Sequence, residues 1–130
     1  MRRDAPAWRL VVEREGPLAV ARVVNLEALG EADVQDLGEQ LLRIVDRGGC
    51  RQIVVDLDGA TGVTSSLLGK LVALYKRTKA EGGRVALCGV SPTLLEALQA
   101  LQLTRLIPAF EGRREGVAAL AAGAVPSATH

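Results

Sequence analysis

Two groups of side chains that could carry out chemistry lie close together near the middle of the sequence. Asp56 and Asp58 form a carboxylate pair at the end of an apolar run, and three consecutive hydroxyl residues, Thr64, Ser65 and Ser66, follow. A carboxylate pair can supply a nucleophile and a general acid or base. A hydroxyl at the start of a helix can carry phosphate, because the unpaired amides and the helix dipole there tolerate negative charge. Residues 56 to 66 therefore form the candidate functional site.

The carboxylate pair favours a catalytic interpretation only weakly. The run Asp56-Leu57-Asp58-Gly59 resembles the nucleophile motif of haloacid-dehalogenase-like phosphatases, in which a buried strand ends in Asp-x-Asp-Gly. That chemistry also needs a magnesium ion held by further acidic residues after a later strand, and no aspartate follows Asp58. A phosphatase based on Asp56 and Asp58 is thus a remote alternative. The simpler interpretation is that both carboxylates satisfy backbone amides in the loop.

Other catalytic and metal-binding arrangements are absent from the sequence. The only histidine, His130, is the last residue, so no Ser–His or Cys–His pair is available within a packed site. Two distant cysteines, Cys50 and Cys88, do not make a zinc site. Gly69-Lys70 lacks the spacing and the hydroxyl of a phosphate-binding loop. We therefore expect a protein that is not an enzyme and has no metal or cofactor.

Composition predicts one small domain with an aliphatic core. The chain has 130 residues, of which 48% are hydrophobic and only 2% aromatic, and a domain of this size folds without disulfides or metals. The formal net charge of +1 gives no electrostatic reason to expect nucleic acid or an anionic membrane as a partner. We expect one domain over residues 1–130, with disordered tails at 1–7 and 123–130, as a monomer or weak dimer.

The sequence shows neither the apolar run of a membrane span nor that of a signal peptide, and this bears on where in the cell we expect the protein. No run approaches the roughly 20 apolar residues of a membrane span, and no apolar stretch follows Arg2 and Arg3 as it would in a signal peptide. Cys50 and Cys88 are expected to be free, buried thiols. A cytoplasmic protein of bacterial type, with no membrane span, is the prediction.

The order of elements predicts an α/β fold. Two β-prone runs flank Gly16-Pro17 and indicate a hairpin, and apolar runs that could be buried on both faces alternate with helical patterns after it. The expected strands are 10–12, 18–24, 52–57, 84–89 and an edge strand at 106–108; the expected helices follow the apolar stripes 34–45, 68–75 and 94–101, with a weak terminal helix at 111–122. This pattern predicts a mixed, mostly parallel sheet with about four helices packed on it.

Several motifs in a fixed order resemble the STAS domain of anti-sigma-factor antagonists. They are Ile53-Val54-Val55-Asp56-Leu57, Val63-Thr64-Ser65-Ser66-Leu67-Leu68-Gly69, Gly82-Gly83, Val85-Ala86-Leu87-Cys88 and Ser91-Pro92. In that family a buried strand leads to Asp-Ser-Ser-Gly at the start of a helix, and a strand ending in Cys precedes a helix that begins with Ser-Pro. The resemblance implies a STAS-like mixed sheet, with an N-terminal hairpin followed by parallel strands.

The resemblance also implies a regulatory function. In the family, an anti-sigma factor that is a serine kinase phosphorylates the first serine of the pair, which is Ser65 here, with Ser66 as second choice. The unphosphorylated protein binds the kinase and frees the sigma factor. The implied partner-binding residues are Thr64, Ser65, Ser66, Leu67 and Asp58, and any ATP belongs to the kinase.

This sequence departs from the family motif at two positions, and one alternative stays open. Thr64 replaces the family aspartate and Leu67 replaces the family glycine; an exposed Leu67 would serve the partner interface. The alternative is a STAS scaffold or accessory subunit, of a stress-sensing complex or a lipid-transport ATPase, without obligatory phosphorylation. The basic residues after Gly69 are interpreted as a solvated surface and not as a nucleic-acid site: Lys70, Lys76, Arg77, Lys79 and Arg84.

Overall fold

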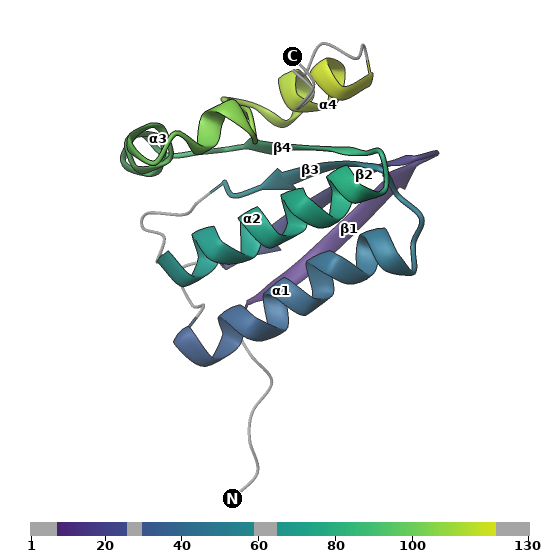
Figure 1. The fold of residues 1–130 in the computed structure, drawn as a ribbon, viewed down its shortest axis with the longest axis horizontal. Coiled ribbons are helices and arrows are strands. Elements are labelled where there is room, and N and C mark those ends of the chain that lie inside the picture. The colour runs from purple at the N-terminus through teal and green to yellow at the C-terminus, as the bar shows by residue number, and fades with distance from the viewer. Residues whose placement is uncertain (1–7, 26–29, 59–64, 122–130) are drawn as a thin grey trace, which may run out of the picture.

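The computed structural model describes residues 8–25, 30–58 and 65–121, and within them five strands and four α-helices form an α/β arrangement (Figure 1). The strands are β1 (Arg9–Glu15), β2 (Leu18–Val24), β3 (Gln52–Asp56), β4 (Arg84–Cys88) and β5 (Ala109–Phe110). The helices are α1 (Glu31–Asp46), α2 (Ser65–Ala80), α3 (Pro92–Ala100) and α4 (Arg113–Ala121), with a short 3-10 helix at Leu103–Arg105. The expected tails at 1–7 and 123–130 lie outside the described residues.

The strands form one mixed sheet in sequence order, β1-β2-β3-β4-β5. The β1–β2 hairpin is antiparallel, and the other three pairs are parallel. Gly16 supplies the positive φ of the hairpin turn, at +60°. Because parallel strands end at the same edge of the sheet, the segments that follow β3 and β4 begin side by side. The prediction of a hairpin followed by parallel strands is confirmed.

The central strands are buried on both faces, as their continuous apolar sequences predict. In β3, Ile53 and Val55 belong to the larger core with α1, α2 and α3, whereas Val54 belongs to a smaller core with α4. Figure 1 shows α1 and α2 side by side, apart from α4. The sheet therefore separates two helical layers, and α4 contacts β3, β4 and β5.

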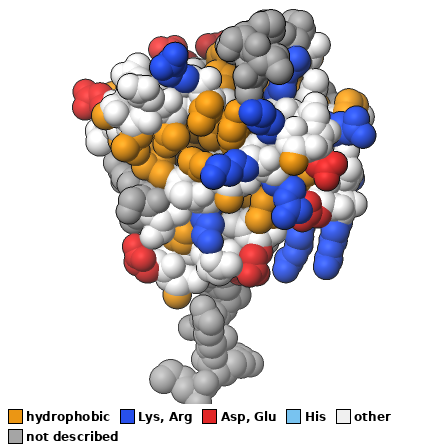
Figure 2. All heavy atoms as spheres, in the orientation of Figure 1, with side chains coloured by type: hydrophobic (Ala, Val, Ile, Leu, Met, Phe, Trp, Pro, Cys, Tyr) orange, Lys and Arg blue, Asp and Glu red, His pale blue; other side chains and the backbone are white. Residues whose placement is uncertain are grey.

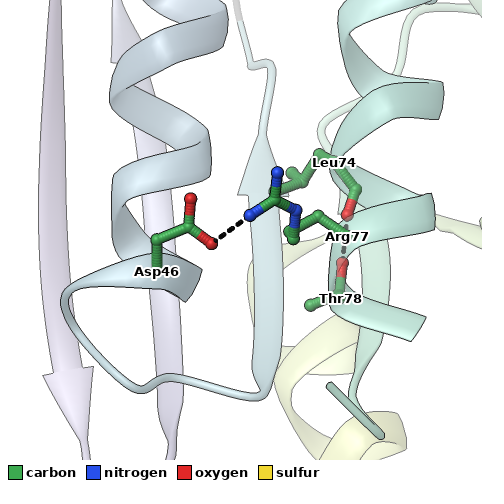
Figure 3. Close-up of polar contacts among 4 residues, drawn as sticks. All are labelled: Asp46, Leu74, Arg77 and Thr78. Carbon is green, nitrogen blue, oxygen red and sulfur yellow. Dashed lines mark hydrogen bonds and ion pairs between the residues drawn. The ribbon is translucent and has the colours of Figure 1, made fainter. Parts of the chain in front are cut away.

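Helices α1 and α2 are joined by polar contacts at both ends of their interface. Arg77 of α2 forms an ion pair with Asp46 of α1, with 2.7 Å between nitrogen and oxygen (Figure 3). Toward the other end, the Lys70 ammonium donates a hydrogen bond to the Gln35 side-chain oxygen. Thr78, which is fully buried, donates its hydroxyl hydrogen bond to the Leu74 carbonyl within α2. The interface fixes the direction of α2 and hence the place of its first turn.

Helix α3 begins as its sequence predicts. The Ser91 hydroxyl accepts a hydrogen bond from the Leu94 amide at 3.2 Å, and Pro92 occupies the first turn, where its missing N–H costs nothing. Leu94 and Leu98 are buried, as expected. Leu101, expected on the same apolar face, is 60% exposed because the helix ends at Ala100.

The strand expected at 106–108 is wrong, because the last strand is Ala109–Phe110. Gln102 adopts a left-handed conformation with φ of 58°, and the chain then turns through the short 3-10 helix. Pro108 joins the ladder only through its carbonyl oxygen, which accepts a hydrogen bond from Leu87 at 2.9 Å. Since proline has no N–H to donate, regular pairing starts one residue later.

Candidate functional site

The candidate site lies where the chain passes from the end of β3 to the start of α2. Ser65 is the first residue of α2, and the Ser66 side chain, one position later, is exposed. The first amides of a helix have no partner within the helix, and its dipole is positive at this end. Thr64 lies outside the described residues. The two serines thus occupy the helix start that the sequence predicts.

Asp56 holds the beginning of the connecting segment from within the sheet. Its carboxylate is only 7% exposed, and Oδ1 accepts a hydrogen bond from the Asp58 amide at 3.0 Å. The prediction that this carboxylate satisfies a loop amide is confirmed. Asp58 is exposed, so one aspartate shapes the turn while the other faces solvent. Asp56 is paired with Arg22 of β2 and with Cys88 of β4 in the sheet register.

Gly89 allows the chain after β4 to lie directly against this turn. Its φ is +67°, and a Cβ at this position would lie 2.6 Å from the Asp58 amide nitrogen and 2.8 Å from Asp56 Oδ1. Any larger residue must therefore displace the turn that leads toward Ser65. No sequence motif identified Gly89 in advance; it was expected as the last residue of the strand 84–89, whereas β4 ends at Cys88.

Replacing Gly89 by alanine is expected to destabilise the protein by about 2–4 kcal/mol, from backbone strain and from crowding of the turn. Gly82→Ala is the matched control, because Gly82 has φ of +77° and no neighbour within 4 Å of its added Cβ. The control should be destabilised only by backbone strain, which costs about 1–2 kcal/mol. Urea unfolding of both variants measures the difference. Equal losses of unfolding free energy in the two variants would show that the turn moves aside for the added methyl group at little cost.

The Cys88 thiol next to Asp56 is protonated and inert at neutral pH. Cys88 is fully buried, and this burial raises the pKa of its thiol from 9.0 to about 12, with a further contribution from the Asp56 carboxylate, which accepts the thiol hydrogen bond. Cys50 is buried as well, and both cysteines are free. The expectation of free core thiols is confirmed, and Cys88 contributes packing rather than reactivity.

The raised pKa predicts a loss of stability in alkaline solution. Between about pH 9 and 12 the unfolded thiol releases its proton while folded Cys88 keeps it, so the free energy of unfolding falls as pH rises. The slope from this residue is at most about 1.4 kcal/mol per pH unit. Urea unfolding from about pH 8 to 10 should show a steeper decline for the natural chain than for Cys88→Ala. Equal slopes would contradict the assignment.

Leu67 does not have the exposed position that the motif suggested. Its side chain is 2% exposed and belongs to the larger core. Since Ser66 is exposed and Leu67 and Leu68 are both buried, the first turn of α2 presents one face to solvent and anchors the other in the core. The exposure expected for Leu67 is therefore wrong, and its buried side chain instead anchors the turn that carries the serines.

The surface around α3 is partly apolar. Figure 2 shows hydrophobic side chains gathered near α3, bordered by Lys and Arg side chains. Leu101 and Leu106, which follow α3 along the chain, are 60% and 39% exposed.

Among the described residues, no group of three His, Cys, Asp or Glu side chains could hold a metal ion. No helix in this described part is long and apolar enough to cross a membrane.

Comparison with known families agrees with this geometry. Residues 12–116 match the family model of the STAS domain. The chain belongs to the STAS domain family. This STAS domain is 29% identical over 72 residues to an anti-sigma F factor antagonist of Paenibacillus polymyxa, and the match spans 55% of this chain and 62% of that relative.

Solved structures of STAS proteins share its fold. An anti-sigma-factor antagonist (STAS) domain protein from Planctomyces limnophilus superposes with a TM-score of 0.76 at 28% identity, covering 86% of this chain and 97% of that one. The unphosphorylated anti-sigma factor antagonist SpoIIAA gives a TM-score of 0.70 at 21% identity, covering 90% and 97%. A structure of the Bacillus SpoIIAA in its phosphorylated form is also similar, with a TM-score of 0.64 at 18% identity over 86% and 97%.

Proposed function

We propose that this STAS domain is a phosphorylation-controlled binding protein, an anti-sigma-factor antagonist that binds an anti-sigma factor kinase when Ser65 is unmodified. The observation that carries the proposal is the place of Ser65 at the first residue of α2, directly after the segment that follows a buried parallel strand. The proposed contact surface consists of Ser65, Ser66 and Asp58, with Thr64 from the segment between them. The protein acts by binding and not by catalysis.

Phosphate at Ser65 would add a charge that the fold tolerates and a binding interface does not. Phosphate adds about −1.5 to −2 charges, and at the start of α2 the helix dipole and unpaired amides compensate for it within the monomer. In a complex, the same charge must lose water against the partner, which costs several kcal/mol unless a cation meets it. Phosphorylation can therefore switch binding off without a change of conformation.

The fixed framework around the turn supports this mode of action. The buried Asp56 carboxylate holds the Asp58 amide, Gly89 packs against the same turn, and Leu67 anchors α2 in the core. Groups that are already held in place before binding lose little conformational entropy when they bind. The exposed Leu101 and Leu106 add apolar area that a protein partner could cover.

The test is to incubate the purified protein with ATP and a candidate anti-sigma factor kinase from the same organism, and then to map phosphate by mass spectrometry. Modification at Ser65 is expected, with Ser65→Ala unmodified and Ser66→Ala still modified. Modification at Ser66 alone would move the switch by one residue. A protein that remains unmodified, and that binds its partner equally well as Ser65→Asp, would instead be a STAS scaffold or accessory subunit.

A further inference from the structure

A groove opens on the face of the sheet opposite to α1 and α2. Helix α4 contacts β3, β4 and β5, and the groove runs between this helix and the neighbouring residues of β1 and β2. Leu18 and Val20, which are 6% and 4% exposed, lie at the bottom of the groove, and Val117 and Ala118 of α4 form its wall. Its volume is about 520 Å³, which lies within the range of small-molecule sites.

Charged side chains border the groove at the start of α4. Arg113 and Arg114 occupy the first turn of this helix, and Glu13 projects from β1. The Arg113 guanidinium and the Glu13 carboxylate form an ion pair at 2.8 Å. Arg114 is exposed and has no ion pair or hydrogen bond among the described residues. One unpaired cation therefore stands beside an apolar floor.

The position of these arginines is unfavourable for the helix itself. The positive end of a helix dipole favours acidic side chains and disfavours cations, yet the first turn of α4 contains two arginines and one glutamate, Glu115. The ion pair with Glu13 offsets this for Arg113, whereas nothing described offsets it for Arg114. A residue that departs from such a local preference, with no compensating contact in the structure, is often a functional residue. A negative ligand would supply the missing compensation.

We propose that this groove binds a small amphipathic carboxylate, of the fatty-acid class, with its head at Arg114 and the start of α4. The aliphatic body would lie on Leu18 and Val20 against Val117. Among the residues that line the groove, two guanidiniums and the Glu13 carboxylate leave a single net positive charge, which one carboxylate head neutralises. Because Glu13 would repel a second negative charge, a monoanion fits better than a phosphate dianion.

The site is separate from the partner surface at the start of α2. The side chains of Leu18 and Val20 belong to the α4 core, whereas Leu67 at the start of α2 belongs to the core on the other face of the sheet. Loss of the carboxylate site would leave the proposed antagonist function untouched, and the reverse holds as well.

Decanoate, titrated into the full chain, tests the proposal by calorimetry and by amide chemical shifts. Binding should shift the amides of Val20, Val117 and Ala118, and the neutral analogue decan-1-ol should bind at least about tenfold more weakly. Arg114→Gln should lose affinity for decanoate by a similar factor, and added salt should weaken binding. The matched control is Arg105→Gln, which removes another exposed arginine, on the 3-10 helix, and should bind normally.

Four results would overturn the proposal. Equal affinity for decanoate and decan-1-ol, or an unchanged Arg114→Gln, would mean that the arginines do not recognise a carboxylate. A chain that dimerises through this face, seen by sedimentation, and ignores decanoate would make a second copy the occupant. If decanoate binds only to a chain that ends at Ala121, residues 122–130 and not a carboxylate would be the natural occupant of the groove.

Discussion

Ser65→Asp is expected to weaken binding to the anti-sigma factor by about a hundredfold or more. A charge buried at the interface without a partner costs several kcal/mol, and about 3 kcal/mol already corresponds to more than a hundredfold in affinity. The same change should leave the fold intact or slightly more stable, because an acidic residue at the start of α2 interacts favourably with the helix dipole. Calorimetric titration measures the affinity, and urea unfolding measures the stability.

The matched control for this substitution is Ser65→Asn, which has nearly the same size and shape as aspartate without its charge. Asparagine keeps a short polar side chain at the first helical position and adds no charge, so Ser65→Asn should bind within a few fold of the natural protein. A loss that is equal in both variants would indicate that shape matters there and not charge. Tight binding by Ser65→Asp would remove the electrostatic basis of the switch.

Leu67→Ala is expected to destabilise the protein by about 2–4 kcal/mol. Its side chain is 2% exposed within the larger core, and truncating a buried leucine loses both transfer free energy and packing. Leu101→Ala is the control, since that leucine is 60% exposed and should change stability by less than about 0.5 kcal/mol. Urea unfolding of both variants gives the comparison.

The same pair of variants separates anchoring from recognition. If Leu67 only anchors α2, Leu67→Ala should bind the partner in proportion to its folded fraction, and stabilising conditions should restore the affinity. A folded Leu67→Ala that still fails to bind would mean that the partner contacts this leucine directly. A loss of stability below about 1 kcal/mol would contradict its place in the core.

The sequence predicted the elements whose local signals agree with the fold. The hairpin at Gly16-Pro17, the continuous apolar runs of β3 and β4, and the Ser91-Pro92 start of α3 were all confirmed. Each depends on neighbours in the chain, such as a turn residue, a run of buried side chains or a cap. The expected carboxylate–amide contact of Asp56 was of the same local kind.

Most of what the sequence did not predict depends on contacts between segments that are distant in the sequence, or on where an element ends. Leu67 departs from the glycine of the motif that the sequence resembles, and only the packing of α2 on the sheet determines that its side chain is buried. Leu101 continues the apolar stripe of α3, but the helix ends before it. Gly89 is constrained by a turn more than thirty residues earlier in the chain. The groove beside α4 likewise depends on how far that helix extends across the sheet, which no local pattern specifies.

The most direct test is the footprint of the bound anti-sigma factor on the amides of this STAS domain. Hydrogen exchange with and without the partner should show the strongest new protection at Asp58 and at Ser65 to Leu68, and phosphorylation at Ser65 should abolish that protection. Protection confined to the β1–β2 hairpin and α4, with the start of α2 exchanging as in the free protein, would contradict the account.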